Sequence, residues 1–427
     1  MSLVLFEDPC PHLAPMTDLR PAWDVRSGAM TLLERLAAIG HAPIAAVPRD
    51  DIASVAREAS PALSRTPDEL AHDDAIARDP GGVLLLNAAC VLPDDRVWSL
   101  AAGEALVDAS HRLIAARVEA RDLPRVLGLA QSGTPLTPDA PHTLRVHASE
   151  GLSLLSRPWH VRTLRDRALT HDLALLARGP TLTHADLAQR GVTLIPGHPV
   201  RVDPSARLSP SCVLDAERGP IVIDAGAIVR PLAVVSGPAY IGPGSSVLDH
   251  AIIKANTAIG PSCKVAGEVG GTIFQGFANK AHDGHLGDSW VGAWANLGAG
   301  TTNSNLLNTY AEVTASAFHA GHMLAKRERT GETFLGAAIA DHAKTAICTR
   351  LMTGAIVHTG VMWAASRAIT GTVAPFAWVT GEGEKRFRLD KFLDIARTVM
   401  ARRGIALGGA MSHRIEQLFH ATDAPRG

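Results

Sequence analysis

Apolar residues recur at every sixth position through much of the C-terminal half of the chain. An amphipathic helix repeats every ~3.6 residues and a strand every ~2, so neither can sustain this spacing. A period of six is typical of the hexapeptide parallel β-helix, in which each flat face points one side chain into a triangular prism. The series contains Val202, Leu208 and Leu214 and then, after a short insertion, Ile223, Val229, Val235, Ile241, Val247, Ile253, Ile259 and Val265. It resumes at Val291 and Leu297, and again at Ile339, Thr345, Leu351 and Val357.

Two segments towards the C-terminus depart from this period. Residues 303–334 break it and are expected to leave the prism as a loop. In residues 389–400 the apolar side chains fall on one stripe at helical spacing, which predicts an amphipathic helix. If this helix packs on the open end or flank of the prism, it covers strand edges that would otherwise stay unpaired.

Residues 1 to about 190 show another pattern, in which short apolar runs alternate with helix-like segments. Such alternation favours an α/β domain with a mainly parallel sheet. We predict strands at 3–6 and 83–86, and helices at 29–39, 51–59 and 98–106. The predicted fold class is α/β plus β: an α/β domain over residues 1–155, a helical connector over 156–195, a β-helix over 196–380, and a C-terminal helix and tail over 381–427.

Composition restricts the partners and the compartment. The 41 basic and 42 acidic residues give a formal charge of −1, which argues against a nucleic acid or an anionic membrane as partner. The five cysteines are scattered and form no C-x-x-C pair, so we expect a reducing compartment. No basic segment precedes an apolar run at the N-terminus, and no stretch of about 18 uncharged apolar residues occurs. We therefore expect a cytoplasmic protein.

A polar cluster lies at residues 279–288 and is followed by a glycine-rich run at 296–302. Its K-A-H-D-G-H-L-G-D and N-L-G-A-G blocks resemble the acetyltransferase half of the GlmU family, whose members acetylate glucosamine-1-phosphate and then uridylylate the product. The resemblance covers residues 200–375. It implies a left-handed β-helix, assembly as a homotrimer, and acyl-CoA (acetyl-CoA above all) bound between neighbouring subunits.

The resemblance also implies catalytic roles. It places the family's catalytic histidine on His282 and the carboxylate that orients it on Glu268. This agrees with the chemistry of the side chains, because an imidazole with an ordinary pKa of about 6.5 suits a general base near neutral pH. A neighbouring carboxylate can hold its tautomer.

The same alignment implies binding roles for the surrounding residues. Backbone amides of the glycine-rich turn would contact the acyl group and stabilise the oxyanion of the thioester. The residues expected at acyl-CoA are Gly298, Ala299 and Gly300, and those expected at the sugar substrate are Asn296, Lys254, His285 and Lys280.

Two other interpretations of the histidines stay open. The pairs His282-x-x-His285 and His319-x-x-His322 have a spacing that converges on a metal in a helix, but on a β-helix corner it usually does not, so no metal site is predicted. The histidines could also be polar turn residues of a surface corner.

The beginning of the chain carries a second resemblance. The run L-x-P-M-T-D-L-R-P at residues 13–21, followed by V-R-S-G at 25–28, is similar to the opening of sugar-1-phosphate nucleotidylyltransferases. It implies that Arg20 and Arg26 bind nucleotide phosphates, and that Asn87 stands where the family has its magnesium-binding aspartate. The glycine-rich loop and the family's lysine are missing here, so Mg²⁺ is expected only if this domain is active. Arg20 and Arg26 could instead be structural salt-bridge partners.

Together these features predict an acyltransferase that uses acetyl-CoA to N-acetylate an amino-sugar phosphate or a nucleotide sugar. One alternative is nucleotidyl transfer to a sugar-1-phosphate, alone or together with acylation. Another is a catalytically silent trimeric scaffold.

Overall fold

The computed structural model describes residues 2–9, 13–137, 144–151, 154–317 and 327–422. Its N-terminal part is an α/β domain with the strand order β2-β1-β3-β5-β4-β6, in which only β5 runs against the others. The strands are β1 (Ser2–Phe6), β2 (Ala45–Val47), β3 (Val83–Asn87), β4 (Glu104–Val107), β5 (Leu113–Val118) and β6 (Arg145–Ala148). The helices are α1 (Leu32–Ala38), α2 (Ala53–Ala59), α3 (Pro67–Ala71), α4 (Asp74–Ala77), α5 (Asp95–Trp98), α6 (Leu123–Gln131) and α7 (His160–Leu176).

One predicted element of this domain is wrong. The segment 98–106 was expected to be a helix, but α5 ends at its first residue and β4 begins near its end. Gly103 between them has a φ of +83°, a backbone conformation that interrupts a helix. The apolar residues of β4 are buried because this strand pairs with both β5 and β6.

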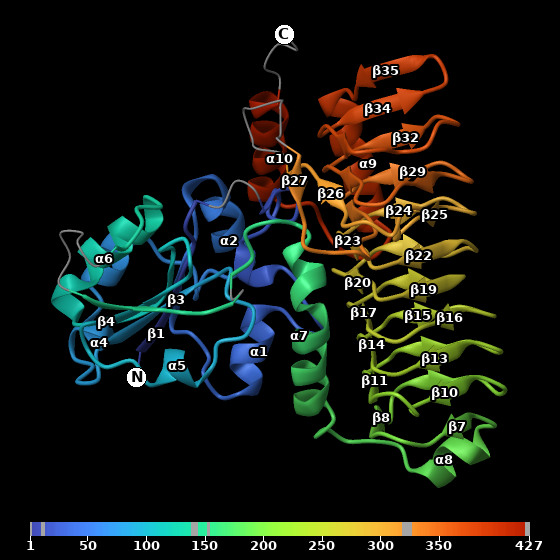
Figure 1. Cartoon of the computed structure of the whole chain (residues 1–427), viewed down its shortest axis with the longest axis horizontal. Coiled ribbons are helices and arrows are strands. Elements are labelled where there is room, and N and C mark those ends of the chain that lie inside the picture. The colour runs from blue at the N-terminus through green and yellow to red at the C-terminus, as the bar shows by residue number, and fades with distance from the viewer. Residues whose placement is uncertain (1, 10–12, 138–143, 152–153, 318–326, 423–427) are drawn as a thin grey trace.

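From Thr193 the chain winds into a stack of triangular coils (Figure 1), after the short helix α8 (His184–Gln189). The first face consists of β7 (Thr193–Ile195), β10 (Val213–Asp215), β13 (Val234–Ser236), β16 (Ile252–Ile253), β19 (Glu268–Gly270) and β22 (His285–Gly287), continued by β25 (Thr302–Asn303) and β30 (Arg350–Leu351). The second consists of β8 (Val200–Val202), β11 (Ile221–Ile223), β14 (Ala239–Ile241), β17 (Thr257–Ile259), β20 (Ile273–Phe274), β23 (Trp290–Val291), β28 (Ala338–Ile339), β31 (Ile356–Val357) and β33 (Thr372–Val373). The third consists of β9 (Arg207–Leu208), β12 (Ile228–Val229), β15 (Ser246–Val247), β18 (Lys264–Val265), β21 (Asn279–Lys280), β24 (Asn296–Leu297), β29 (Lys344–Thr345), β32 (Met362–Ala364), β34 (Ala377–Thr380) and β35 (Gly383–Arg386).

The predicted left-handed parallel β-helix of the hexapeptide type is confirmed. The side chains of the six-residue series point inward and form one buried aliphatic column, as the period requires. Three of the inward positions are polar and buried: Lys280, Asn303 and Thr345. The predicted loop begins one residue later than expected, because Asn303 still belongs to β25. Beyond it, β26 (Thr314–Ala315) and β27 (Glu328–Arg329) form an antiparallel pair outside the prism, and residues 318–326 lie outside the described residues.

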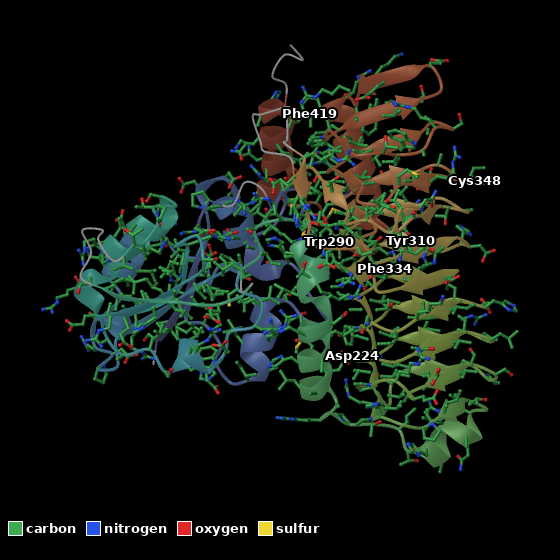
Figure 2. All side chains as sticks on the ribbon, in the orientation of Figure 1. Asp224, Trp290, Tyr310, Phe334, Cys348 and Phe419 are labelled. Carbon is green, nitrogen blue, oxygen red and sulfur yellow. The ribbon has the colours of Figure 1, made fainter. Side chains whose placement is uncertain are left out.

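The second face of the β-helix is covered by the N-terminal part of the chain. In Figure 1, α7 lies between the α/β domain and this face. The outward residues of the face are apolar and share one buried cluster with the α/β domain, and they are Val222, Tyr240, Ala258, Ile273 and Trp290. Figure 2 shows Trp290 at this junction, where its indole N–H donates to the backbone carbonyl of Arg26.

The predicted C-terminal helix is α9 (Leu389–Ala401), and a second helix, α10 (Gly409–Ala421), follows it. Phe392 of α9 packs edge-on against Phe376 at a corner of the β-helix. Helix α10 packs against α2, so the two helices connect the β-helix to the α/β domain. In the parts of the chain that the structure describes, we find no helix with both the length and the apolar character needed to cross a bilayer.

Candidate functional site

His282 is exposed at the corner between the third and first faces, in the turn from β21 to β22. Lys280, two residues earlier, points into the prism and is 1% exposed. Its ammonium donates to the backbone carbonyls of Ala266 (3.1 Å) and His282 (2.7 Å), and burial lowers its pKa to about 8. The expectation that Lys280 binds substrate is therefore wrong, because on β21 it aligns with the inward residue Val265 of β18 and so turns into the prism.

Glu268 pairs with His285 and Lys254 rather than with His282. Its carboxylate accepts from the Lys254 ammonium and lies 3.4 Å from Nδ1 of His285. The hydrogen bond and charge of Lys254 keep the pKa of Glu268 below its ordinary value. Register explains the pairing, since Glu268 and His285 are aligned partners on β19 and β22 while His282 lies on the corner before β22. The predicted orienting contact between Glu268 and His282 is thus replaced by one to His285.

The glycines at the ends of these strands make room for a polar niche. A side chain on Gly287 would lie 2.7 Å from Nε2 of His285 and 2.8 Å from Nδ2 of Asn305, and one on Gly270 would contact Lys254. The niche is formed by Lys254, Glu268, His285 and Asn305 on the first face. Asn305 was not anticipated, although it belongs to the asparagine-rich run that follows the N-L-G-A-G block.

The glycine-rich turn at 298–300 lies directly above the His282 corner, and its three amides differ. Gly298 N–H is bonded to Thr345, and Gly300 N–H donates to the carbonyl of Asp283. The amides of Gly298 and Gly300 are therefore not available to an oxyanion. The expectation that they stabilise the oxyanion of the thioester is wrong. Ala299 N–H has no acceptor within the described residues and is the donor that this turn can offer a ligand.

Two hollows meet at this corner. A groove of about 870 Å³ runs along the third face to the end of α9, and a smaller hollow wraps around the corner next to Ile347 and Cys348. His282, Ala299 and Ile347 line both of them. Figure 2 shows Cys348 projecting at this outer edge of the β-helix.

The predicted residue Asn296 lines the groove, within a ladder of outward side chains on the third face. In this ladder Lys264 aligns with Asn279, Asn279 with Asn296, and Asn296 with Lys344. Arg402 and Arg403, at the C-terminal end of α9, complete the groove. The sequence analysis did not single out these four cations. The two lysines could have been found, because each directly precedes an inward member of the six-residue series and so faces outward.

The two arginines predicted to bind nucleotide phosphates are occupied by contacts within the chain. Arg20 donates to Asp341 of the β-helix at 2.5 Å. Arg26 is buried and bonded to Glu34, to Ala29 and to the backbone of Gln275. Both are structural salt-bridge partners, one of the two interpretations that the sequence left open, because the β-helix covers the surface where they lie.

Asn87 and the charged side chains near it are also occupied by contacts within the α/β domain. Asn87 is fully buried and donates to Asp8 and to the carbonyl of Leu113. Asp8 is held by Arg112, and Glu7 by Arg49. A magnesium ion needs carboxylates that are free to coordinate it, so the described residues at this sheet edge do not fit a Mg²⁺ site, and Asn87 is not placed to bind a nucleotide.

The described residues contain no cluster of three or more histidine, cysteine, aspartate or glutamate side chains arranged to hold a metal. His282 and His285 point to different surroundings, one on the corner and one on the first face. The pair His319 and His322 lies outside the described residues.

Comparisons with known proteins address each half of the chain. A family model described as sugar nucleotidyl transferase matches residues 3–181. No curated protein sequence matches the chain.

Three similar solved structures each cover about half of this chain. A hexapeptide transferase family protein from Anaplasma phagocytophilum is 14% identical over 55% of this chain and 97% of its own, with a TM-score of 0.26. A mutant of the N-acyltransferase AntD from Bacillus cereus, in complex with dTDP-4-amino-4,6-dideoxyglucose and coenzyme A, is 9% identical over 52% and 97%, with a TM-score of 0.22. UDP-N-acetylglucosamine acyltransferase from Francisella novicida is 13% identical over 52% and 87%, with a TM-score of 0.19. The chain thus joins a region that matches the sugar nucleotidyl transferase family to a hexapeptide-type β-helix, the two-part organisation that the resemblance to the GlmU family implied.

Proposed function

We propose that this protein transfers an acyl group from acyl-CoA to an amino group of a sugar phosphate or nucleotide sugar, with His282 as the general base. The observation that carries the proposal is the position of His282: its exposed ring lies where the groove and the corner hollow meet, beside the unbonded amide of Ala299. We also propose that the acyl group is acetyl and that the protein is cytoplasmic, as expected from the sequence.

The reaction requires a proton acceptor and an oxyanion donor close together. His282 takes a proton from the acceptor amine as its nitrogen attacks the thioester carbonyl. The C–N bond forms, the C–S bond breaks, and the leaving thiolate takes up a proton. Ala299 N–H donates to the carbonyl oxygen while negative charge develops there.

The niche on the first face is the proposed site for the sugar. Lys254 supplies a cation for a phosphate, and Asn305 and His285 supply hydrogen bonds to hydroxyl groups. Glu268 holds His285 in one orientation, which makes the pair a recognition element beside the base.

Thiol release from acetyl-CoA with glucosamine-1-phosphate tests the proposal. The wild type should release thiol, and His282→Ala should lose at least ~100-fold in kcat, the usual contribution of a positioned base. The matched change His285→Ala should mainly raise KM for the sugar. Unchanged thiol release in a folded His282→Ala variant refutes the base role.

We further propose a homotrimer, as the resemblance to the GlmU family implies. Apolar side chains on or beside the first face are exposed in the single chain: Leu232 at 51%, Ile252 at 44% and Ile347 at 73%. Light scattering on the purified protein tests this, and a monomeric mass contradicts it.

The family match of residues 3–181 favours a second candidate, nucleotidyl transfer to a sugar-1-phosphate. Against this candidate, Asp8, Glu7 and Arg20 each form an ion pair within the chain, so they are not free to bind a metal ion or a nucleotide phosphate. Pyrophosphate release from a panel of nucleoside triphosphates with sugar-1-phosphates distinguishes the two candidates.

A further inference from the structure

The niche on the first face is tied to helix α7 through one carboxylate, that of Asp288. One oxygen of this carboxylate, Oδ1, accepts from Nη1 of Arg165 at 2.7 Å and lies 3.0 Å from Nε of Arg162, and both arginines belong to α7. The other oxygen, Oδ2, accepts from the side-chain nitrogen of Asn305 at 2.8 Å. The N-terminal part of the chain thus contacts the group that holds a residue of the niche.

This contact is built into the corner between the first and second faces. Arg165 is 4% exposed and also donates to the carbonyl of Gly271 at 2.5 Å. A side chain on Gly271 would lie 2.5 Å from Nη1 of Arg165 and 2.8 Å from Oδ1 of Asp288. The glycine therefore leaves the space through which the guanidinium reaches the carboxylate.

The carboxylate decides which way the amide of Asn305 points. A carboxylate only accepts hydrogen bonds, so the group that meets it is the amide nitrogen. The amide lies over Gly287, beside the ring of His285. Nothing within the described residues donates to the amide oxygen, and the side chain is only half-buried. This oxygen is left as an acceptor for a bound molecule.

Helix α7 also holds the loop that leaves the prism after β25. Thr163 donates to the carboxylate of Glu332 at 2.7 Å, and Nη1 of Arg162 lies 3.6 Å from the same carboxylate. Asn305 lies near the start of this loop and Glu332 near its end, so one helix holds both, directly or through Asp288. The place of Asn305 on the first face is thus fixed from α7.

Stabilisation of the interface between the two halves explains only part of this arrangement. An ion pair with Arg165 uses one carboxylate oxygen and does not require the other to hold an amide. We propose that Asp288 is a positioning residue for the acceptor: held by α7, it keeps the amide of Asn305 turned so that its oxygen accepts a hydrogen bond from a hydroxyl or amino group of the sugar. The inference rests on the proposed function, and it adds that the N-terminal part of the chain shapes the acceptor site.

Calorimetric titration with glucosamine-1-phosphate measures this contact without acyl transfer. Asn305→Ala should raise Kd about tenfold, the loss expected when one hydrogen bond is removed. Asp288→Asn lets the amide turn over, because the new side chain also offers a donor, and should raise Kd to a similar extent. The double variant Asp288→Asn/Asn305→Asp again places a donor opposite a carboxylate and keeps an oxygen in the niche, so Kd should return to within about threefold of the wild-type value.

Arg165→Met tests the contribution of α7. Its matched control is Arg157→Met, because Arg157 pairs with Glu328 of the same loop, away from the niche. Arg165→Met should raise KM for the sugar about fivefold while KM for acyl-CoA stays unchanged, and Arg165→Lys should recover part of the loss. Arg157→Met should change neither constant. A loss of stability alone, which urea unfolding measures, would not separate the two Michaelis constants.

The outcomes separate this proposal from the proposed function. If Asn305→Ala and Asp288→Asn bind glucosamine-1-phosphate as the wild type does, or if the double variant recovers nothing, the positioning role is overturned. Thiol release that requires His282, with an unchanged KM for the sugar in these variants, overturns the positioning role alone. Binding that depends on both residues, in a wild type that releases no thiol, overturns the proposed function alone. A wild type that neither binds this sugar phosphate nor releases thiol overturns both.

Discussion

Lys280 donates a 2.7 Å hydrogen bond from inside the β-helix to the backbone carbonyl of His282 on its surface. The inward positions before and after it on the third face carry Val265 and Leu297, so the ammonium lies in an otherwise aliphatic column. A buried charge is costly unless it is hydrogen-bonded. Lys280 meets this requirement by joining the His282 turn to the carbonyl of Ala266 on the preceding coil, and it thereby fixes the backbone of the candidate base.

Replacing this lysine should separate catalysis from stability. Lys280→Met has a similar shape and removes the charge, so we expect the free energy of unfolding to change little. The His282 turn loses its internal anchor, so kcat should fall about tenfold, because misplacing a reacting group is costly, while KM for acyl-CoA stays close to the wild-type value. Steady-state kinetics and urea unfolding measure both, and an unchanged kcat contradicts the positioning role.

The same lysine predicts a pH dependence of stability. Its pKa is lowered from 10.5 to about 8 by burial, so between these values the unfolded chain binds more protons than the folded one. The stability of the wild type relative to Lys280→Met should therefore rise as the pH increases from 8 to 10.5 and should be constant below about pH 8. Urea titrations across this interval test the sign, and a constant difference throughout refutes the lowered pKa.

The pairing of Glu268 predicts which histidine it supports. In a double-mutant cycle on kcat/KM, Glu268→Gln and His285→Ala should be strongly non-additive because the two side chains interact directly. Glu268→Gln combined with His282→Ala should be closer to additive. The opposite result would restore Glu268 as the partner of His282.

Arg35 and Asp172 join α1 to α7 through two hydrogen bonds of 2.6 and 2.8 Å, with both side chains buried. Burial opposes ionisation of Asp172, but Arg35 keeps the pKa of this carboxyl below its ordinary value. Arg35→Met leaves the carboxylate buried without its cation and should cost about 3–5 kcal/mol of stability.

The exposed pair of Arg57 and Glu69 is the matched control for this prediction. Arg57→Met should cost at most about 1 kcal/mol. Equal losses in the two variants, measured by chemical denaturation, would contradict the structural role of the buried pair.

Cys348 is exposed in the corner hollow that His282 and Ala299 line, whereas Cys90, Cys212 and Cys263 are buried. Among these four described cysteines, N-ethylmaleimide should therefore modify Cys348 first, and the modification should block thiol release by filling the hollow. Excess CoA should slow the modification. Cys348→Ser serves as the control, and inhibition of this variant at the wild-type rate would place the sensitive residue elsewhere.

The architecture of the C-terminal half was predictable because it repeats. Each inward residue, such as Val247 or Ile253, occupies its place through the period alone, and every coil stacks on the one before it. The end of the period also predicted that the chain leaves the prism, which it does after Asn303. The relation of His282 to Ala299 was expected from the family resemblance, because the six-residue series is interrupted between Val265 and Val291.

The pairings within and between coils were not predictable in this way. Coils here differ in length, so whether Glu268 meets His282 or His285 depends on the register of β19 and β22. The prediction of a helix at 98–106 was wrong for a related reason. Strand β4 forms because it pairs with β5 and β6 on its two sides, and its own residues do not specify these partners.

The sequence by itself determined a periodic, aliphatic β-helix with a polar corner, because its repeat is local and each turn satisfies the same packing requirement. Only the tertiary structure decided that Arg20 belongs to Asp341 and that α9 brings two arginines over the third face. These contacts join residues more than a hundred positions apart, and no spacing within the chain specifies which distant surfaces meet.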